Sequence, residues 1–237
     1  MNHTLFNRIE QRTVQREVVA LLRDAIINGA LDLGEDINEA AIASQMDISR
    51  APLREALRQL EQEGLIQRIP NRGCFVTNFT EHDVIEVFSL RATLECMGMK
   101  WANERLTPDD IRYLRQQIEG VRQRIAAGDL DHLTELDMQF HEYILIRAGH
   151  SRLLRAWYAQ SAQGRMLLSR RFRTLADYTP ETVVLDHTRI LDALERHDTA
   201  AAIALTEEIR DRVQRECIQV LHHRAKKASM LAGGNTR

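Results

Sequence analysis

The 237-residue sequence predicts a mainly α-helical protein that contains one small β-hairpin. Only four Pro and 11 Gly occur in the chain, so few residues break helices. Apolar side chains recur three and four residues apart over most of the length, which is the period of an amphipathic helix. One stretch near residue 70 departs from this period, where two β-prone runs flank a Pro/Asn/Gly turn.

The first 80 residues are expected to contain three helices and the hairpin. The helices are expected at 12–28, 39–46 and 49–63. Asn38 and Ser49 are suited to cap the second and third helices, because their side-chain oxygens can accept from free N–H groups of the first turn. The β-prone runs are 65–69 and 74–77, with the turn at 70–73 between them.

The rest of the chain is predicted to be an all-α helical bundle. Six helices are expected at 81–104, 107–127, 130–148, 151–174, 180–197 and 199–226. The change of pattern after the hairpin predicts two domains, 8–78 and 79–227. The remaining tail, residues 228–237, is expected to be disordered.

Composition excludes some classes and leaves nucleic-acid binding open. The net charge is -2, and residues 1–79 carry 9 basic and 11 acidic side chains, so bulk charge does not indicate a partner. No stretch approaches the ~18–20 apolar residues of a membrane span, and the N-terminus lacks the apolar core of a signal peptide. We therefore expect a cytoplasmic protein without a membrane partner. Because the net charge is uninformative, evidence for DNA binding must come from the positions of the charged residues.

The order helix, short helix, tight turn, longer helix, hairpin is that of a winged helix-turn-helix, which binds DNA. In the longer helix one stripe is apolar, and the other face carries Arg50, Arg54 and Arg58 at i, i+4, i+8. Such a row can span phosphates and guanine edges in a major groove. The first turn, with Ser49, Ala51 and Pro52, brings the positive end of the helix dipole to phosphate.

The hairpin tip offers further candidate contacts with DNA, and the Arg row has an alternative interpretation. Arg72 lies at the tip, where it can reach the minor groove or the backbone, and Gly73 permits close approach. The alternative is that the Arg row pairs with neighbouring acids on a solvated face. Those acids are Glu55, Glu61 and Glu63.

Three motifs in this region closely resemble the GntR family of bacterial regulators. They are ISRAPLREALRQL at 48–60, EGLI at 63–66 and RGCFV at 72–76. The resemblance implies that Arg50, Arg54, Arg72 and Gly73 contact DNA. It also departs from the family, since the short helix has Asn-Glu-Ala at 38–40 where the family often has an Arg.

Residues 81–227 resemble the FCD ligand-binding domain of the FadR branch of this family. The resemblance rests on Leu90-Arg91 with Leu94-Glu95, on DMQFH at 137–141 and on DHTRIL at 186–191. Six helices rather than seven are similar to the VanR subgroup. The resemblance implies a homodimer that binds a palindromic operator in double-stranded DNA, commonly as a repressor, and that responds to a small carboxylate effector.

Asp137, His141 and His187 form a candidate metal site. Asp137 and His141 are i, i+4 and project from one helical face, while His187 comes from a later helix. One carboxylate and two imidazoles suit a divalent Zn, Ni, Mn or Fe ion, whereas by spacing alone a helical Asp-x-x-x-His is more often a surface or local pair. The family usually adds a His 22 residues after the His187 position. Ile209 stands there and cannot be a ligand, so a three-ligand site is expected.

Arg91 and Arg165 are the candidate contacts for the effector, Arg91 by the resemblance. The alternative for Arg91 is an i, i+4 ion pair with Glu95. Two other functions stay open at this point: a DNA-binding regulator with a degenerate pocket, and a metal-dependent enzyme with a DNA-binding appendage. The enzyme is disfavoured because no acid or base of convincing spacing accompanies the trio, and we expect a regulator.

Overall fold

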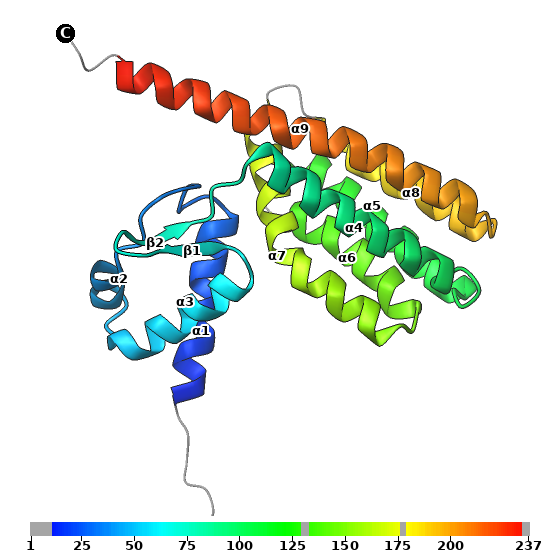
Figure 1. Cartoon of the computed structure of the whole chain (residues 1–237). Coiled ribbons are helices and arrows are strands. Elements are labelled where there is room, and N and C mark those ends of the chain that lie inside the picture. Colours follow the sequence, from blue (N-terminus) through cyan, green and yellow to red (C-terminus); the bar gives the residue numbers. More distant parts are fainter. Residues whose placement is uncertain (1–10, 129–132, 176–178, 234–237) are drawn as a thin grey trace, which may run out of the picture. The chain divides into compact units, whose positions relative to one another are not determined.

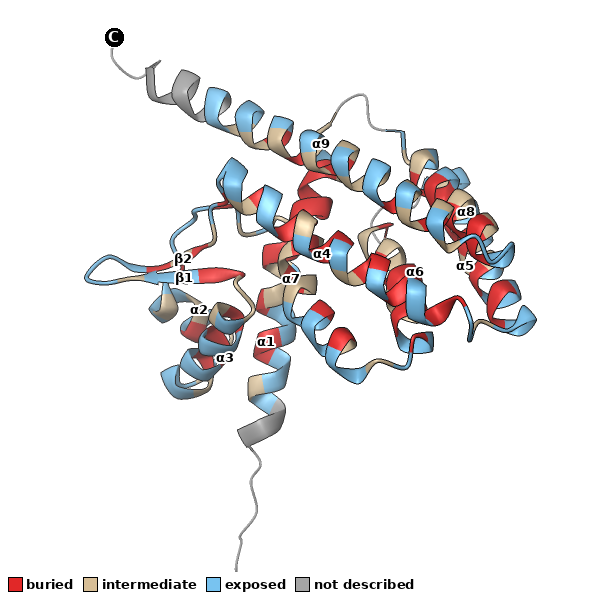
Figure 2. Ribbon diagram, turned by 45° about the vertical axis from the view of Figure 1, so that its right-hand side comes forward, coloured by how far each residue is buried: buried red, intermediate tan, exposed pale blue. Residues whose placement is uncertain are grey.

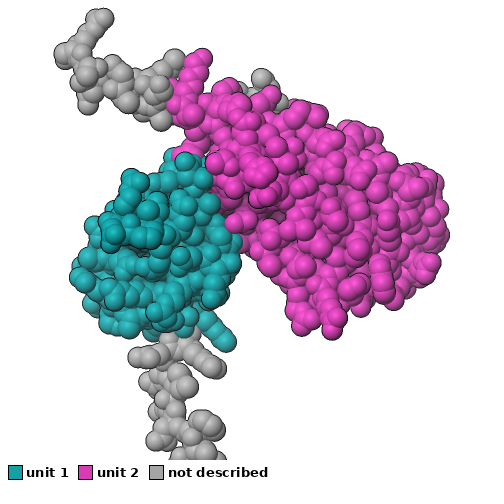
Figure 3. Space-filling view, viewed as in Figure 1, with its two compact units in different colours: residues 1–78 teal, residues 79–237 magenta. Residues whose placement is uncertain are grey.

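The computed structural model describes residues 11–128, 133–175 and 179–233, and these are organised into two compact units, residues 1–78 and 79–237 (Figures 1 and 3). In this part of the chain the only sheet is a two-stranded hairpin, and everything else that is regular is helical. The predicted mainly α fold, with a hairpin in the first unit and six helices in the second, is confirmed. No helix in these ranges is long and apolar enough to cross a bilayer.

The described part of unit 1, from residue 11 onward, contains three helices and the hairpin, within one or two residues of the predicted bounds. They are α1 (Gln11–Ile27), α2 (Glu39–Gln45), α3 (Arg50–Gln62), β1 (Ile66–Ile69) and β2 (Gly73–Val76). The strands are antiparallel, with Ile66 opposite Val76, and Asp36 adds an isolated bridge to Phe75. Helix α1 packs against α3, so the apolar sides of both helices form the core of this unit (Figure 2).

The two helix caps of unit 1 differ. The Asn38 side chain accepts from the backbone N–H groups of Ala40 and Ala41, as expected. Ser49 occupies the N-cap position of α3, but its side chain makes no cap hydrogen bond. Pro52 stands at the third helical position and has no N–H, so one of the two usual donors to such a cap is absent. The expectation that the Ser49 hydroxyl caps this helix was therefore wrong.

Unit 2 is a bundle of six described helices (Figure 1). They are α4 (Glu81–Ala102), α5 (Pro108–Ala126), α6 (Leu133–Arg147), α7 (Ser151–Thr174), α8 (Glu181–Glu195) and α9 (Thr199–Gly233). Helix α4 is central, because it packs against α6, α7 and α9, while α8 packs between α5 and α9. Capping boxes begin two helices: Thr80 with Asp83 starts α4, and Thr107 with Asp110 starts α5.

Helix α9 is longer than the sequence predicted. We expected it to end near residue 226 and a disordered tail to follow, but the helix continues to Gly233. Ala, Ser, Met and Leu fill 228–232, and none of them breaks the hydrogen-bond ladder, so propagation is favoured until the glycine pair. The predicted end of α9 near residue 226 was therefore wrong. The last part of the expected tail, 234–237, and the expected start of α6 at 130–132 lie outside the described residues.

Candidate functional site

Helix α3 separates an apolar face from a basic face. Leu53, Ala56, Leu57 and Leu60 are fully buried against the unit 1 core. Arg50, Arg54 and Arg58 all lie on the exposed side of the helix. The arrangement on which the DNA argument depends is therefore present, with three guanidinium groups available to a partner outside the protein.

The acids next to this row do not bury it. Arg58 pairs with Glu55 at 2.7 Å, and both side chains are more than half exposed. Glu63 instead pairs with Arg23 of α1, and Glu61 with Arg68 of β1. Exposed pairs of this kind contribute about 0–1 kcal/mol, so a polyanion could displace the Glu55 pair at little cost.

The hairpin tip has the backbone that its sequence suggested. Asn71 and Gly73 have φ of 61° and 117°, and Arg72 between them is exposed. At φ near 117° a side chain would be strained, and a Cβ on Gly73 would also lie 3.4 Å from Asp36 Oδ1. Gly73 is therefore needed for the shape of the tip that presents Arg72.

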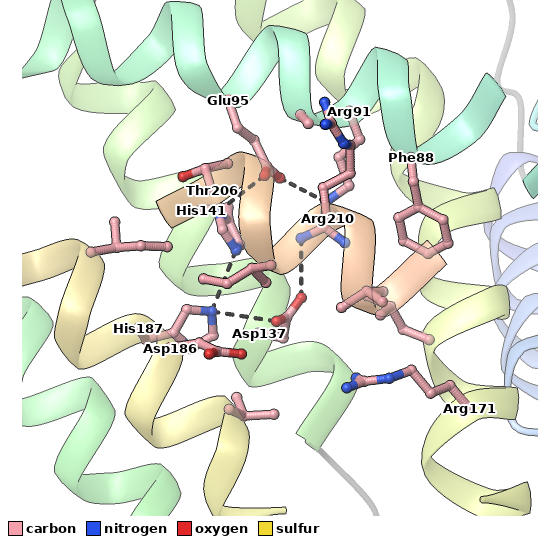
Figure 4. Close-up of a pocket in the computed structure, with 16 residues that line it drawn as sticks. Phe88, Arg91, Glu95, Asp137, His141, Arg171, Asp186, His187, Thr206 and Arg210 are labelled. Atoms are coloured by element: carbon pink, nitrogen blue, oxygen red, sulfur yellow. Dashed lines mark hydrogen bonds and ion pairs between the residues drawn. The ribbon is translucent and has the colours of Figure 1, made fainter. Parts of the chain in front are cut away.

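Unit 2 contains a cavity between its helices that brings together side chains far apart in the sequence (Figure 4). Its empty volume is about 570 Å³ with its opening to solvent included. The ionisable side chains at its wall are Arg91, Glu95, Asp137, His141, Arg171, Asp186, His187 and Arg210. Apart from the two histidines, three of these are acidic and three are basic, so the wall is close to neutral when both imidazoles are uncharged.

Asp137, His141 and His187 converge in this cavity, which the spacing alone could not establish (Figure 4). His187 Nε2 lies 3.3 Å from His141 Nε2 and 3.3 Å from Asp137 Oδ1. Ligand atoms bound tetrahedrally at about 2.1 Å from one ion lie about 3.4 Å apart. The two distances from His187 match this value, and all three donor atoms lie within 4.8 Å of one another, so the group is suited to a divalent ion.

Glu95 also contacts this site. From the sequence it was expected only as a possible ion-pair partner of Arg91. Its Oε2 lies 3.4 Å from His141 Nδ1, and its Oε1 accepts from Trp157 Nε1 at 3.1 Å. His141 Nδ1 is buried and has no hydrogen bond of good geometry. A carboxylate behind a ligating imidazole fixes its tautomer and raises its basicity, so Glu95 is placed to orient His141 once Nε2 binds an ion.

Electrostatics also favours the ligand forms of two residues. Burial lowers the pKa of His141 to about 4, more than the nearby Glu95 charge raises it, so the imidazole is neutral at pH 7. Burial alone would raise the pKa of Asp137, but the Arg91 charge and the His187 hydrogen bond outweigh it and lower this pKa well below its usual range. A metal needs neutral imidazole and ionised carboxylate, and both are present. The residues fit a divalent metal.

The candidate effector contacts have different positions. Arg91 lines the cavity and is buried, where it donates to Glu95 Oε1 at 2.6 Å and to Asp137 Oδ2 at 3.0 Å. The alternative pairing with Glu95 is therefore present, together with a second carboxylate that sequence analysis missed. Arg165 pairs with Glu135 and is not among the residues that line the cavity.

Ile209 lines the cavity, at the position where the family resemblance implied a His. An alkyl side chain there adds apolar wall and no ligand atom. Arg210 and Thr206 of the same helix also line the cavity, and Arg171 reaches it from α7. Sequence analysis missed these residues, because helical spacing does not show which turns of α7 and α9 meet the metal-ligand candidates.

Comparison with known proteins identifies both units. Residues 14–76 match the family model described as bacterial regulatory proteins, gntR family, and residues 86–212 match the FCD domain model. The gluconate operon transcriptional repressor of Bacillus subtilis is 31% identical, with 81% of this chain and 80% of that protein covered. The HTH-type transcriptional regulator YdhC of the same organism is 29% identical, with 76% of this chain and 80% of that protein covered.

A solved structure has the same fold. The GntR transcriptional regulator from Rhodococcus sp. RHA1 superposes with a TM-score of 0.72 at 24% identity, covering 87% of this chain and 98% of that one. The family matches and the similarity to the gluconate repressor indicate a DNA-binding regulator. The exposed Arg row of α3 is consistent with this. The chain belongs to the gntR family of bacterial regulatory proteins: it is a DNA-binding transcriptional regulator that carries an FCD domain, and it is not an enzyme.

Proposed function

We propose that this regulator binds a palindromic operator as a homodimer, with α3 of each copy in a major groove. Arg50, Arg54 and Arg58 would contact base edges and phosphates, and the first turn, with Ser49, Ala51 and Pro52, would lie on the backbone. Arg72 and Gly73 of the hairpin tip would contact the neighbouring groove. The exposed Arg row opposite a buried leucine stripe is the observation that carries this proposal. Because the target of such a regulator is chromosomal DNA, the proposed location is the cytoplasm.

Dimerisation explains why such a site would be palindromic. Two copies related by a twofold axis present two recognition helices, which enter successive major grooves about 34–36 Å apart. Relatives named as repressors, among them the gluconate operon repressor of B. subtilis, favour repression as the sign of regulation. Bound at a promoter, the dimer would exclude transcription until an effector lowers its operator affinity.

The effector that we propose is a small carboxylate bound in the unit 2 cavity with a divalent Zn, Ni, Mn or Fe ion. Asp137, His141 and His187 would hold the ion, which supplies an open coordination position for a carboxylate oxygen. Because the cavity wall is close to neutral, a divalent ion makes it net positive and attracts an anion. Among the described residues the buried Asp186 Oδ1 has no hydrogen-bond partner, so it can accept from a hydroxyl group of the effector.

Two arginines of the cavity would act in different ways. Arg91 already donates to Glu95 and Asp137, so it would position these two carboxylates, and through Asp137 it would orient the ion. Arg210 pairs with Asp211, whose side chain is 53% exposed, at 2.8 Å. That pair is easily exchanged, and Arg210 is our candidate for direct contact with the effector. Arg165 keeps no effector role in this proposal.

An effector changes DNA binding only if it binds two arrangements of the dimer with different affinity. The cavity joins residues of five helices, α4, α6, α7, α8 and α9, so filling it can shift these helices against one another. A shift transmitted to the dimer would change the spacing of the two α3 helices. A filled cavity without any such shift would leave operator affinity unchanged.

The test begins with operator selection from random DNA by the full-length protein, followed by binding titrations with wild type and Arg54→Ala. Elemental analysis of the purified protein and thermal shifts with added Zn²⁺, Ni²⁺ or Mn²⁺, alone and with hydroxy acids, test the cavity. We expect metal to stabilise the protein and an acid to stabilise it further and weaken operator binding. Operator binding without any response to metal or acid would instead support a degenerate pocket. Ile209, which stands where the family usually has a His, is the residue that favours this alternative.

A further inference from the structure

One acidic side chain lies within the proposed DNA-reading surface. Glu39 is the first residue of α2, and its side chain is 22% exposed. Its Oε2 accepts from Arg54 Nε of α3 at 3.2 Å, and its Oε1 accepts from Arg68 of β1 at 3.1 Å. A single carboxylate therefore bridges the recognition helix and the first strand of the hairpin.

The contact occupies one part of the Arg54 guanidinium and leaves the rest available. Glu39 engages Nε, while within the described residues the two terminal nitrogens have no side-chain partner and the side chain is 58% exposed. A guanidinium held at Nε has its orientation restricted, so its terminal N–H groups can be presented together to guanine O6 and N7. Without Glu39 the same side chain is free to fold onto the nearest phosphate.

The charge of Glu39 acts in the same direction. It offsets part of the positive charge of Arg54 and Arg68, and it repels any phosphate that approaches them. Non-specific affinity for DNA comes almost entirely from phosphate contacts, whereas specific affinity adds base contacts. An acid at this place therefore weakens binding to every sequence but weakens binding to the operator less, because there Arg54 gains base contacts.

We propose that Glu39 is a specificity-determining residue, which orients Arg54 toward the base edges and withholds Arg54 and Arg68 from phosphate on non-operator DNA. This inference rests on the proposed function, in that it requires α3 to lie in the groove. It assigns to the short helix, which lacks the Arg common in the family, a part in discrimination between sequences.

The test compares Glu39→Gln, which removes the charge and keeps the size, with wild type on the selected operator and on a random duplex of equal length. We expect binding to random DNA to tighten about tenfold, and its dependence on salt to steepen by about one phosphate equivalent. Operator affinity should tighten less, so the ratio of the two affinities should fall, by at most about tenfold. Glu39→Ala, a second variant with the same expectation, covers the case in which Gln perturbs folding, which a melting curve detects.

Glu61→Gln is the matched control. This substitution removes the same charge as Glu39→Gln. In the wild-type protein Glu61 also pairs with Arg68, at 3.4 Å, but among the described residues it has no contact with Arg54. Its specificity ratio should stay within about twofold of wild type, since the base-contacting side chain is untouched. An unchanged ratio in both Glu39 variants, or an equal fall in Glu61→Gln, overturns the inference.

Arg54→Ala separates this inference from the proposed function. If Arg54→Ala loses operator affinity while the Glu39 variants keep the wild-type ratio, only the inference fails. If Arg54→Ala binds the operator like wild type, the proposed role of α3 fails first. In the Arg54→Ala background, Glu39→Gln should lower the specificity ratio less than it does in wild type, because the side chain it orients is gone and only the contact with Arg68 remains.

Discussion

The two units use charged side chains in opposite ways. In unit 1 the basic side chains of α3 are exposed, and Arg54 and Arg58 pair with acids that are partly open to solvent. In unit 2, Arg91, Glu95 and Asp137 form a chain of ion pairs whose side chains are 15% exposed or less. Exposed pairs exchange partners at little cost, whereas a buried network changes only when a group of matching charge enters. The first arrangement suits a surface that meets DNA, and the second suits a selective sensor.

The largest expected effect comes from breaking the buried network. Arg91→Ala leaves the Glu95 and Asp137 carboxylates buried without their cation, so it should destabilise the protein by about 3–5 kcal/mol. Urea unfolding followed by circular dichroism measures this. Arg58→Ala, which breaks an exposed pair, is the control and should cost at most about 1 kcal/mol. Equal effects of the two substitutions would remove the contrast between the units.

Metal binding should depend on the donors that converge in the cavity. His187→Gln removes one of three ligands, so the stabilisation by Zn²⁺, about 2.7 kcal/mol at free metal 100 times the Kd, should be lost. Thermal unfolding with and without the ion measures this loss. His222→Gln, which changes an exposed histidine paired with Glu81, should respond to metal as wild type does.

Ile209→His sharpens the same test, since it adds an imidazole at the cavity wall. A fourth ligand should lower the Kd for Zn²⁺ in a chelator competition. Metal affinity that is the same in Ile209→His and in wild type would mean that the ion binds elsewhere.

Operator binding should be sensitive to the exposed Arg row of α3, and the metal response of the cavity should not depend on that row. Arg54→Ala should cost about 1–3 kcal/mol of operator affinity, because a bidentate guanine contact is worth that much. A fluorescence anisotropy titration at fixed salt measures it, and melting temperature and metal response should stay at wild-type values. A loss of metal response in this variant would contradict the separation of the two sites.

The smallest effect concerns a buried carboxylate outside the cavity. Burial alone would raise the pKa of Asp110, but hydrogen bonds from Thr107 and Tyr143 outweigh it, so its folded pKa lies below the usual value. Its stabilising contribution is therefore present above the unfolded pKa of about 3.9, and it is lost as the pH falls through the folded pKa. Asp110→Asn should cost about 1 kcal/mol at pH 7 and less at a pH below the folded pKa. An equal cost at both pH values would show that the charge is not involved.

Sequence periodicity predicted most of the fold, because helices depend on side chains three and four residues apart. The leucine stripe of α3 and the six helices of unit 2 follow from that local rule. The missing Ser49 cap has in part a local cause, since Pro52 occupies one of the two positions that can donate to it. To predict that α9 continues to Gly233, one would have had to weigh helix propensity against the usual fraying of chain ends.

The candidate site was predictable only in part. The three metal-ligand candidates come from two helices 46 residues apart, and the family resemblance, not the spacing, grouped them. Glu95 behind His141, Arg210 at the cavity wall and Glu39 between two arginines all depend on how separate elements pack. No period in a single sequence encodes such long-range contacts, so these residues were found only in three dimensions.

Protection of guanine N7 from methylation, mapped on the selected operator, tests the central claim most directly, because N7 faces the major groove. We predict two protected clusters, one in each half-site and about 10–10.5 base pairs apart or a multiple of that, and the loss of one guanine per half-site in Arg54→Ala. Protection that is identical in wild type and Arg54→Ala, or confined to the minor groove, would contradict the placement of α3 in the major groove.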